Sequence, residues 1–262
     1  MSDPVARVRF LGTGTSHGVP MIGCRCDTCR SSDPRDRRWR ASLHVSFAAG
    51  PSAMIDTSPD LRSQALAFGV ETLDVVLFTH SHADHILGLD DVRAFNERQG
   101  RPISCYGDEA TLAEVRRTFA YAFRDGHVGG WLPRLLLFPV AGPFCLVRQV
   151  VVPVPIWHGR RQILGYRIGD FAYLTDCSGI PDGSWPLLDG LDTLAIGALR
   201  YRPHPTHFTV SEALEVIARV RPGRALLTHV CHDLGHAATA ARLPPGVELA
   251  YDGLMVDVHA SA

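Results

Sequence analysis

The sequence predicts an α/β protein in which short buried strands alternate with helices. Apolar runs rich in branched side chains, such as residues 75–79, are typical of buried strands. Two longer segments have helical periodicity, and polar residues follow several of the apolar runs directly. Open α/β sheets bind ligands at the carboxyl ends of their strands. With 262 residues, 46% of them hydrophobic, the chain can bury a substantial core.

The expected strands begin near the N-terminus. Residues 5–11 alternate in part between apolar and polar side chains and end in a glycine-rich segment, which indicates a strand. Residues 43–47 and 53–56 flank Ala49-Gly50-Pro51 and are expected to form a hairpin. Residues 126–143 are rich in glycine and proline, and their pattern assigns them to no element.

Two helices are expected. Residues 108–123 place Leu112, Val115, Phe119 and Ala122 on one face, as an amphipathic helix does. The sequence Thr209-Val210-Ser211-Glu212 has the pattern of a capping box and predicts a helix to Val220, ended by Pro222-Gly223. No internal repeat or linker divides the chain, so we expect a single domain over residues 1–262 with a metal-binding loop at residues 24–29.

The most informative motif follows the apolar run at 75–79. It reads His80-Ser81-His82-Ala83-Asp84-His85. Alternate residues of an extended segment share a face, so His80 and His82 can bind one ion, and a following turn can direct Asp84 and His85 to a second. Imidazole and carboxylate ligands suit zinc, manganese or iron.

This H-x-H-x-D-H motif resembles the signature of the metallo-β-lactamase superfamily. The resemblance implies a four-layer αβ/βα sandwich with a two-metal site at one edge of the sheets, and further ligands in the order His, Asp, His. Three residues fit, because each follows an apolar run: His158, Asp176 and His229. We expect His80, His82 and His158 to hold one ion, Asp84, His85 and His229 to hold the other, and Asp176 to lie between them.

A second metal site is indicated by Cys24-Arg25-Cys26-Asp27-Thr28-Cys29, in which Cys24, Cys26 and Cys29 have the spacing of a zinc knuckle. From spacing alone, the fourth ligand could be Cys231, His232 or His236.

The two motifs together resemble the PhnP type of phosphoribosyl cyclic phosphodiesterase. The similarity also includes residues 12–20, Thr228-His229-Val230-Cys231-His232 and Tyr251-Asp252-Gly253. It implies that His232 completes a structural zinc site and that His207 protonates the leaving group, with His204 as the competing candidate. The Cys knuckle also occurs in PqqB-like cofactor-biosynthesis proteins, but these generally lack the intact H-x-H-x-D-H motif and rank lower.

The resemblance implies hydrolysis of a small phosphodiester, and the ligand types suit it, because two divalent ions (Mn or Zn) can neutralise a phosphate and lower the pKa of a water. The ligands alone are equally compatible with a thioesterase or a lactamase, because hydroxide also attacks carbonyl groups. The residues expected to act in catalysis are His207 and Asp84. Asp56 follows a strand and is either a hydrogen-bond partner of a ligand histidine or a turn carboxylate. Arg200 and Arg202 could hold a substrate phosphate, although solvent exposure is the favoured interpretation. The remaining histidines are expected to be structural or solvent-facing: His17, His44, His127, His204, His236 and His259.

Composition excludes several functions. The formal net charge is −1, which disfavours a transfer-RNA-processing nuclease because such an enzyme should have a basic surface. The chain contains arginine but no lysine, which excludes catalysis through a lysine Schiff base. Seven cysteines, an odd number with three of them in the knuckle, argue against a disulfide framework. No segment has the length of a membrane span, and the N-terminus does not resemble a secretory signal. We therefore expect a cytoplasmic enzyme that acts on a small phosphorylated substrate, has no membrane or nucleic-acid partner and could form a homodimer.

Overall fold

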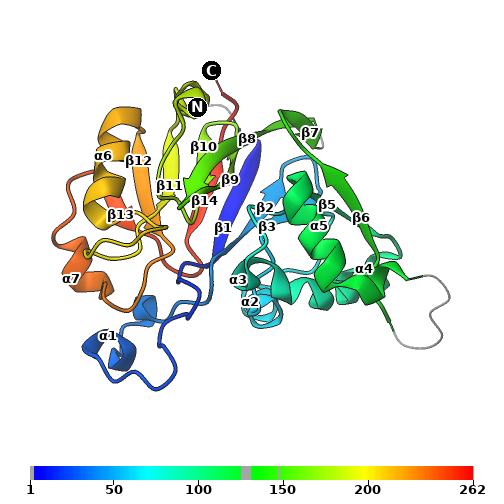
Figure 1. The fold of residues 1–262 in the computed structure, drawn as a ribbon, viewed down its shortest axis with the longest axis horizontal. Helices are drawn as coiled ribbons and strands as arrows, with labels where there is room; N and C mark the ends of the chain where they lie inside the picture. The colour runs from blue at the N-terminus through cyan, green and yellow to red at the C-terminus, as the bar shows by residue number, and fades with distance from the viewer. Residues whose placement is uncertain (1–2, 125–130, 147, 262) are drawn as a thin grey trace.

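The computed structural model describes residues 3–124, 131–146 and 148–261. These residues form two seven-stranded sheets that pack face to face, with helices on the outer side of each sheet (Figure 1). This confirms the predicted four-layer sandwich of the metallo-β-lactamase fold. Among the described residues, no helix has both the length and the apolar character needed to cross a bilayer.

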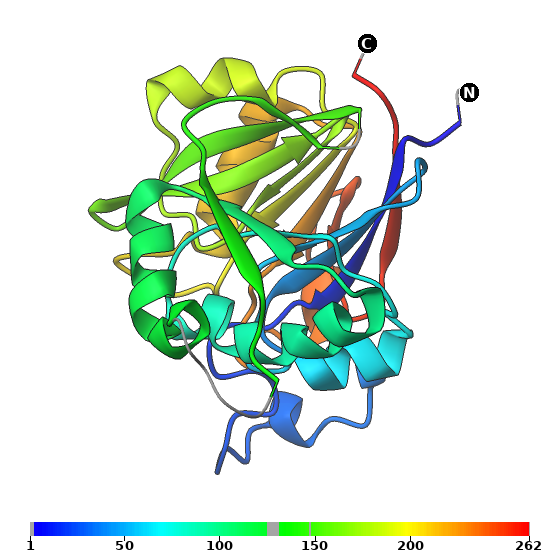
Figure 2. The ribbon, with the colours of Figure 1, turned by 90° about the vertical axis from the view of Figure 1, so that its right-hand side faces the viewer.

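The first sheet has the order β14-β1-β2-β3-β4-β5-β6. Strands β1 to β3 and β14 pair antiparallel, whereas β3 to β6 pair parallel. The two ends of the chain lie side by side because β1 pairs with β14, with Ala6 opposite Val258 (Figure 2). The strands are β1 (Ala6–Gly12), β2 (Ser42–Phe47), β3 (Ser52–Ile55), β4 (Val75–Leu77), β5 (Ile103–Gly107), β6 (Leu135–Pro139) and β14 (Met255–Val258).

The second sheet repeats this plan with the order β13-β12-β11-β10-β9-β8-β7. Strands β10 to β13 pair parallel, and β7 to β10 pair antiparallel. The strands are β7 (Phe144–Leu146), β8 (Gln149–His158), β9 (Arg161–Ile168), β10 (Phe171–Leu174), β11 (Thr193–Gly197), β12 (Arg224–Thr228) and β13 (Val247–Leu249).

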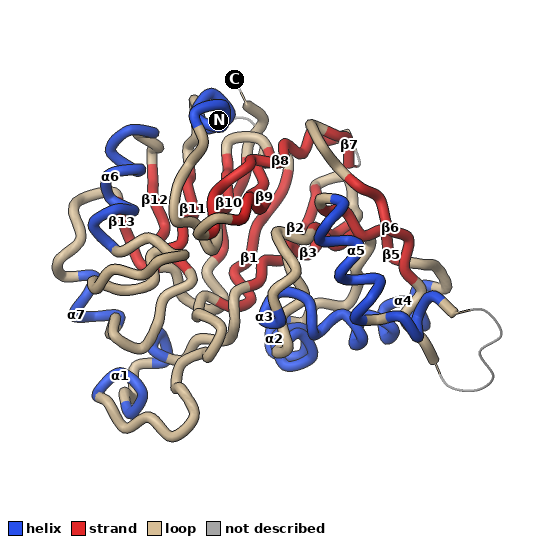
Figure 3. The backbone as a smooth tube through the Cα atoms, viewed as in Figure 1, coloured by secondary structure: helices blue, strands red, loops and turns tan. Residues whose placement is uncertain are grey.

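Helices flank the two sheets (Figure 3). Those beside the first sheet are α2 (Leu61–Phe68), α3 (Ala83–Ile86), η2 (Leu87–Val92), α4 (Arg93–Gln99), α5 (Glu109–Thr118) and η3 (Ala120–Phe123). Those beside the second sheet are η4 (Asp182–Leu188), α6 (Val210–Val220) and α7 (His236–Ala240). The short helices α1 (Asp27–Arg30) and η1 (Pro34–Asp36) belong to a loop that extends away from the sheets (Figure 1).

The hydrophobic core is formed by side chains on both faces of the two sheets. Side chains from both sheets, including Phe10, Val45, Tyr166 and Leu226, are fully buried between the layers. The opposite faces of the strands pack on the helices and form two further apolar clusters. Burial on both faces explains why β4 and the centre of β12 (Ala225, Leu226 and Leu227) have uninterrupted apolar sequences. This packing fixes the positions of the strand ends, where the polar motifs lie.

Most sequence-based elements agree with the structure, with two corrections. The β2–β3 hairpin and the capping box of Thr209 and Glu212 are present. The helix expected over residues 108–123 ends at Thr118 and continues only as the 3₁₀ turn η3. Strand β6 lies in the segment that the pattern assigned to no element, of which residues 126–130 are outside the described residues.

Candidate metal centres

The predicted ligands follow the carboxyl ends of strands in both sheets. This placement brings residues far apart in sequence to one edge of the sandwich. His82 caps α3, and Asp84 and His85 lie within it. The residues that follow strands are His80 after β4, Asp176 after β10 and His229 after β12, while His158 ends β8.

Three of the strand-end residues have left-handed backbone conformations. The φ angles are 64° at Asp56, 56° at Asp176 and 53° at His229. Such angles are uncommon for residues with a Cβ and are found at functional sites held by the surrounding fold. Each one turns the chain sharply out of its strand.

The side chains form two adjoining clusters, and within each cluster the candidate ligand atoms lie within 4.8 Å of one another. Asp176 belongs to both clusters: its Oδ2 lies 3.8 Å from His80 Nε2, and its Oδ1 lies 3.1 Å from His229 Nε2. A carboxylate in this position can contact two ions. The first cluster comprises His80, His82, His158 and Asp176, and the second comprises Asp84, His85, Asp176 and His229.

The ring nitrogens fit metal ligation. His158 Nδ1 donates to the Thr206 carbonyl at 2.8 Å, which leaves Nε2 for the cluster. The buried Nε2 atoms of His80, His85 and His229 have no hydrogen-bond partner among the described residues. Unpaired buried nitrogens are costly unless a ligand satisfies them. The residues therefore fit divalent ions, and their role as ligands stays a prediction.

Asp56 orients two of the histidines. Its carboxylate lies 2.7 Å from His85 Nδ1 and accepts hydrogen bonds at 2.8 Å from the backbone N–H and the hydroxyl of Thr79. The Thr79 oxygen in turn lies 3.0 Å from His80 Nδ1. Burial raises the pKa of Asp56, while the charge and hydrogen bond of His85 oppose that shift. Of the two interpretations of Asp56, the structure favours the hydrogen-bond partner of a ligand histidine.

His207 lies next to the clusters without belonging to either. Its Nδ1 is 4.0 Å from Asp176 Oδ2, and its ring stacks on His229 with centroids 5.0 Å apart. Burial, and then the charge of His229, lower the pKa of His207 to about 3. An anionic substrate at this ring would oppose that shift. His204 is farther out, with its ring 5.0 Å from that of His207.

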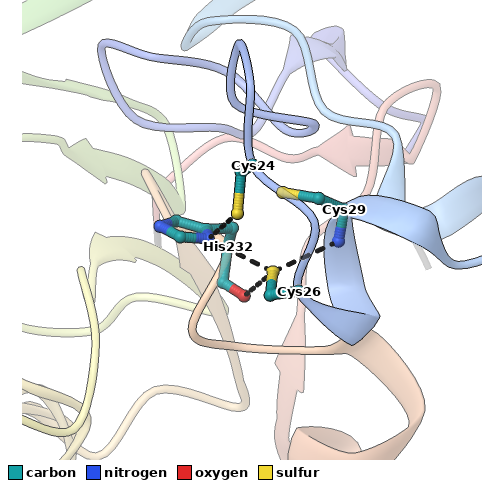
Figure 4. Close-up of side chains that lie close together, drawn as sticks. All are labelled: Cys24, Cys26, Cys29 and His232. Atoms are coloured by element: carbon teal, nitrogen blue, oxygen red, sulfur yellow. Dashed lines mark hydrogen bonds between the residues drawn. The ribbon is translucent and has the colours of Figure 1, made fainter.

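The knuckle cysteines and His232 point toward one another (Figure 4). The sulfurs of Cys24 and Cys26 each lie 3.3 Å from His232 Nδ1. His232 is thus the fourth member of the cluster, and Cys231 and His236 are not. Three cysteines and one histidine match the ligands of a closed structural zinc site.

A buried arginine, which the sequence analysis missed, ties the knuckle loop to the His229 segment. Arg38 donates to the carbonyls of Cys231 and Leu234 and forms a 3.0 Å ion pair with Asp36. Asp36 also accepts from the backbone N–H of His236 at 2.7 Å. Nothing in the arginine-rich run at 35–40 distinguishes Arg38 from its exposed neighbours, because its distant partners in the 231–234 turn are backbone carbonyls.

The other histidines fall into three groups. His236 is buried and His44 is partly buried, and burial lowers the pKa of His44 to about 4. His17 is exposed on the loop after β1, and His259 is partly buried near the C-terminus. His127 lies outside the described residues.

Cys26→Ser is expected to lower zinc content and thermal stability together. Loss of a structural metal site is one of the few changes that cost more than about 2 kcal/mol, which corresponds to roughly 4–8 °C in a chain of this size. Zinc analysis and thermal denaturation test this, with Cys145→Ser at an exposed cysteine as the control. A variant that keeps its melting temperature but loses turnover would instead make the knuckle a catalytic site.

Comparisons with known proteins identify the family. Residues 53–230 match the model of the beta-lactamase superfamily domain. A crystal structure described as a new diphosphatase from the PhnP family has a TM-score of 0.91 and 42% identity to this chain, over 98% of this chain and 99% of that one. The chain belongs to the PhnP family of the metallo-β-lactamase superfamily. The resemblance seen in its motifs is thereby confirmed.

This PhnP-family chain is also similar to two further proteins, which differ in their identity to it and in how much of their length it covers. It is 40% identical over 252 residues to an octanoyltransferase of Porphyromonas gingivalis, covering 95% of this chain but 51% of that protein. The chain therefore spans about half the length of that relative. Zn²⁺-bound PqqB from Methylobacterium extorquens has a TM-score of 0.80 at 19% identity, over 96% of this chain and all of that one, which shows a shared fold.

Proposed function

We propose that the protein is a metal-dependent phosphodiesterase acting on a small cyclic or nucleotide-like phosphodiester, such as a phosphoribosyl 1,2-cyclic phosphate. The observation that carries this proposal is the pair of clusters sharing Asp176. Two adjoining cation sites suit a reacting group whose attacking and leaving oxygens both need charge stabilisation. The PhnP-family relative named a diphosphatase also acts at phosphorus, which supports the same chemistry.

The metal set that fits these residues is two divalent ions, Mn or Zn, at the histidine and aspartate clusters, and one structural Zn at the knuckle. When bound, the two ions would supply positive charge for the phosphate and lower the pKa of a water. The protein's own residues hold the candidate ligand side chains in position through hydrogen bonds. Asp56 and Thr79 orient His85 and His80, and the Thr206 carbonyl orients His158.

His207 is the proton donor in this proposal. Water adds its oxygen to phosphorus, the bond from phosphorus to the leaving oxygen breaks, and that oxygen takes the proton of His207. The proton that the water loses restores His207, so the net reaction is hydrolysis. The ring lies beside Asp176 and outside both clusters, where a leaving oxygen can reach it.

A hydrolysis screen with added manganese or zinc tests the proposal. It compares a phosphodiester, a phosphomonoester, a thioester and a lactam, each with a chelator-treated control. The phosphodiester should be the best substrate, and activity should return on adding metal to the chelated protein. The thioester is included because one relative is named an octanoyltransferase. Faster cleavage of the thioester or the lactam would contradict the proposal.

A further inference from the structure

The ring of His229 is not oriented by a hydrogen bond of its own. His229 belongs only to the second cluster, where its Nε2 lies 3.1 Å from Asp176 Oδ1 and 3.7 Å from Asp84 Oδ2. Neither of its ring nitrogens has a hydrogen-bond partner among the described residues. His85 and His158 differ, because a partner at Nδ1 orients each of those rings. The position of the His229 ring therefore depends on its backbone.

That backbone is held by contacts from the N-terminal part of the chain. The φ of 53° at His229 is one that the surrounding structure must maintain. Directly after it, the Val230 N–H donates to the Thr13 carbonyl at 3.0 Å, and the Thr15 N–H donates to the Val230 carbonyl at 3.2 Å. The conformation of His229 is thus fixed by hydrogen bonds to residues more than 200 positions away in sequence.

The end of the knuckle loop packs on the same contacts. Gly14 forms parallel bridges with both Val230 and Arg40, and its N–H donates to the Trp39 carbonyl at 2.8 Å. A Cβ at Gly14 would lie 3.0 Å from the carbonyl oxygens of Arg38 and Trp39. Only glycine allows this close approach without a shift of those backbone atoms. The exit of the knuckle loop is therefore joined to the segment after His229 through a residue that has no side chain.

Arg38 spans the 231–234 turn with its side chain. Its Nη1 donates to the Cys231 carbonyl at 3.2 Å, and its Nη2 donates to the Leu234 carbonyl at 2.7 Å. The guanidinium is fully buried, lies 3.0 Å from Asp36 and donates from Nε to the Arg35 carbonyl at 3.2 Å. Hydrogen bonds from a buried charged group are among the stronger ones in proteins. The guanidinium therefore fixes the distance between the two ends of the turn.

We propose that Arg38 is a positioning residue for the second cluster: through the 231–234 turn it holds His229 in place and so raises the affinity of that cluster for a divalent ion. The inference rests on the predicted role of His229 as a metal ligand and is independent of the substrate. The first cluster has no member in or beside this turn, so its affinity should not depend on Arg38. A group that orients a metal ligand typically changes metal affinity by about 10- to 100-fold.

Calorimetric titration with Mn²⁺ tests this role. The protein is first treated with a chelator until only the knuckle zinc remains, which the soft thiolate ligands retain against Mn²⁺. Arg38→Met should weaken one Mn²⁺ site by roughly 10- to 100-fold and change the other by less than about threefold. The matched control is Arg37→Met, which removes an exposed arginine whose contact to the Ser31 carbonyl is 3.5 Å long, and it should change neither site. Equal weakening of both sites in Arg38→Met, or of neither, would overturn the inference.

A second variant guards against misfolding. Arg38→Lys keeps the positive charge beside Asp36, but an ammonium lacks the planar fork that reaches the carbonyls of Cys231 and Leu234 together. It should therefore fold and still show the selective loss of one Mn²⁺ site. If Arg38→Met does not fold, Arg38→Lys alone decides, and unchanged Mn²⁺ affinity in that variant would refute the inference.

Hydrogen exchange of the chelated protein gives a readout without metal in the clusters. In both Arg38 variants the amides of Val230 and Cys231 should exchange faster than in the wild-type protein, while amides in β4, which precedes the first cluster, should not change. Faster exchange throughout the chain would show a general loss of stability and count against a positioning role. If no phosphodiester is hydrolysed but one Mn²⁺ site still depends on Arg38, the reaction is wrongly assigned and the positioning role stands.

Discussion

Asp176→Asn is expected to release metal from both histidine and aspartate clusters and to reduce hydrolysis by more than about 100-fold. Removing a group that only orients a metal ligand lowers metal affinity or activity by up to about 100-fold. Asp176 lies in both clusters, so its replacement should lower activity further. Asparagine keeps the shape of the side chain and tolerates the φ of 56° at this position. The loss can therefore be attributed to the missing charge rather than to misfolding.

Metal analysis by mass spectrometry checks this result, because the knuckle zinc should remain while the other metal is lost. His158→Ala is the matched comparison, since His158 belongs to one cluster and should affect that ion more than its neighbour. If Asp176→Asn retained all of its metal and full turnover, the predicted role of this carboxylate as a ligand of both ions would be refuted.

His207→Ala should keep the metal of both clusters and still lower turnover by about 10²- to 10⁴-fold, as expected for a positioned general acid. The loss should depend on the leaving group. A sugar alkoxide needs a proton to depart, whereas a nitrophenolate is a stable anion and hardly does. The variant should therefore be severely impaired on a ribosyl phosphodiester and much less so on bis(p-nitrophenyl) phosphate.

Steady-state kinetics of both substrates, with metal analysis alongside, measures this difference. His204→Ala is the control, because its ring adjoins that of His207 but lies farther from Asp176. Equal losses on the two substrates would assign His207 a positioning role. Full activity of His207→Ala together with an inactive His204→Ala would move the proton donor to His204.

Local sequence was sufficient to predict that the first residues of the candidate metal site lie together. His80, His82, Asp84 and His85 lie within six positions, so their proximity does not depend on the rest of the fold. The later members of the clusters were predicted because each follows an apolar run and because the family resemblance gave their order. Parallel strands then bring such residues to one edge, as the structure shows.

Contacts to backbone atoms could not be predicted in the same way. The carbonyl of Thr206 fixes His158, and carbonyls of the 231–234 turn hold Arg38, but a carbonyl is present at every residue. Spacing alone left His232, Cys231 and His236 open, because the choice depends on the shape of that turn, and only the family resemblance indicated His232. Strand β6 was missed because it joins its sheet by long-range pairing with β5, which local composition does not reveal.

The left-handed conformations of Asp56, Asp176 and His229 have a consequence for protein engineering. Each costs on the order of 1 kcal/mol, against a total stability of about 5–15 kcal/mol for a typical protein. Glycine relieves that strain because it lacks a Cβ. Selection for heat resistance alone could therefore favour glycine at Asp176 and His229 and remove side chains on which the proposed chemistry depends. At Asp56 the hydrogen bonds to Thr79 and His85 outweigh the strain. Thermostable libraries of this chain therefore need a simultaneous screen for activity to keep Asp176 and His229.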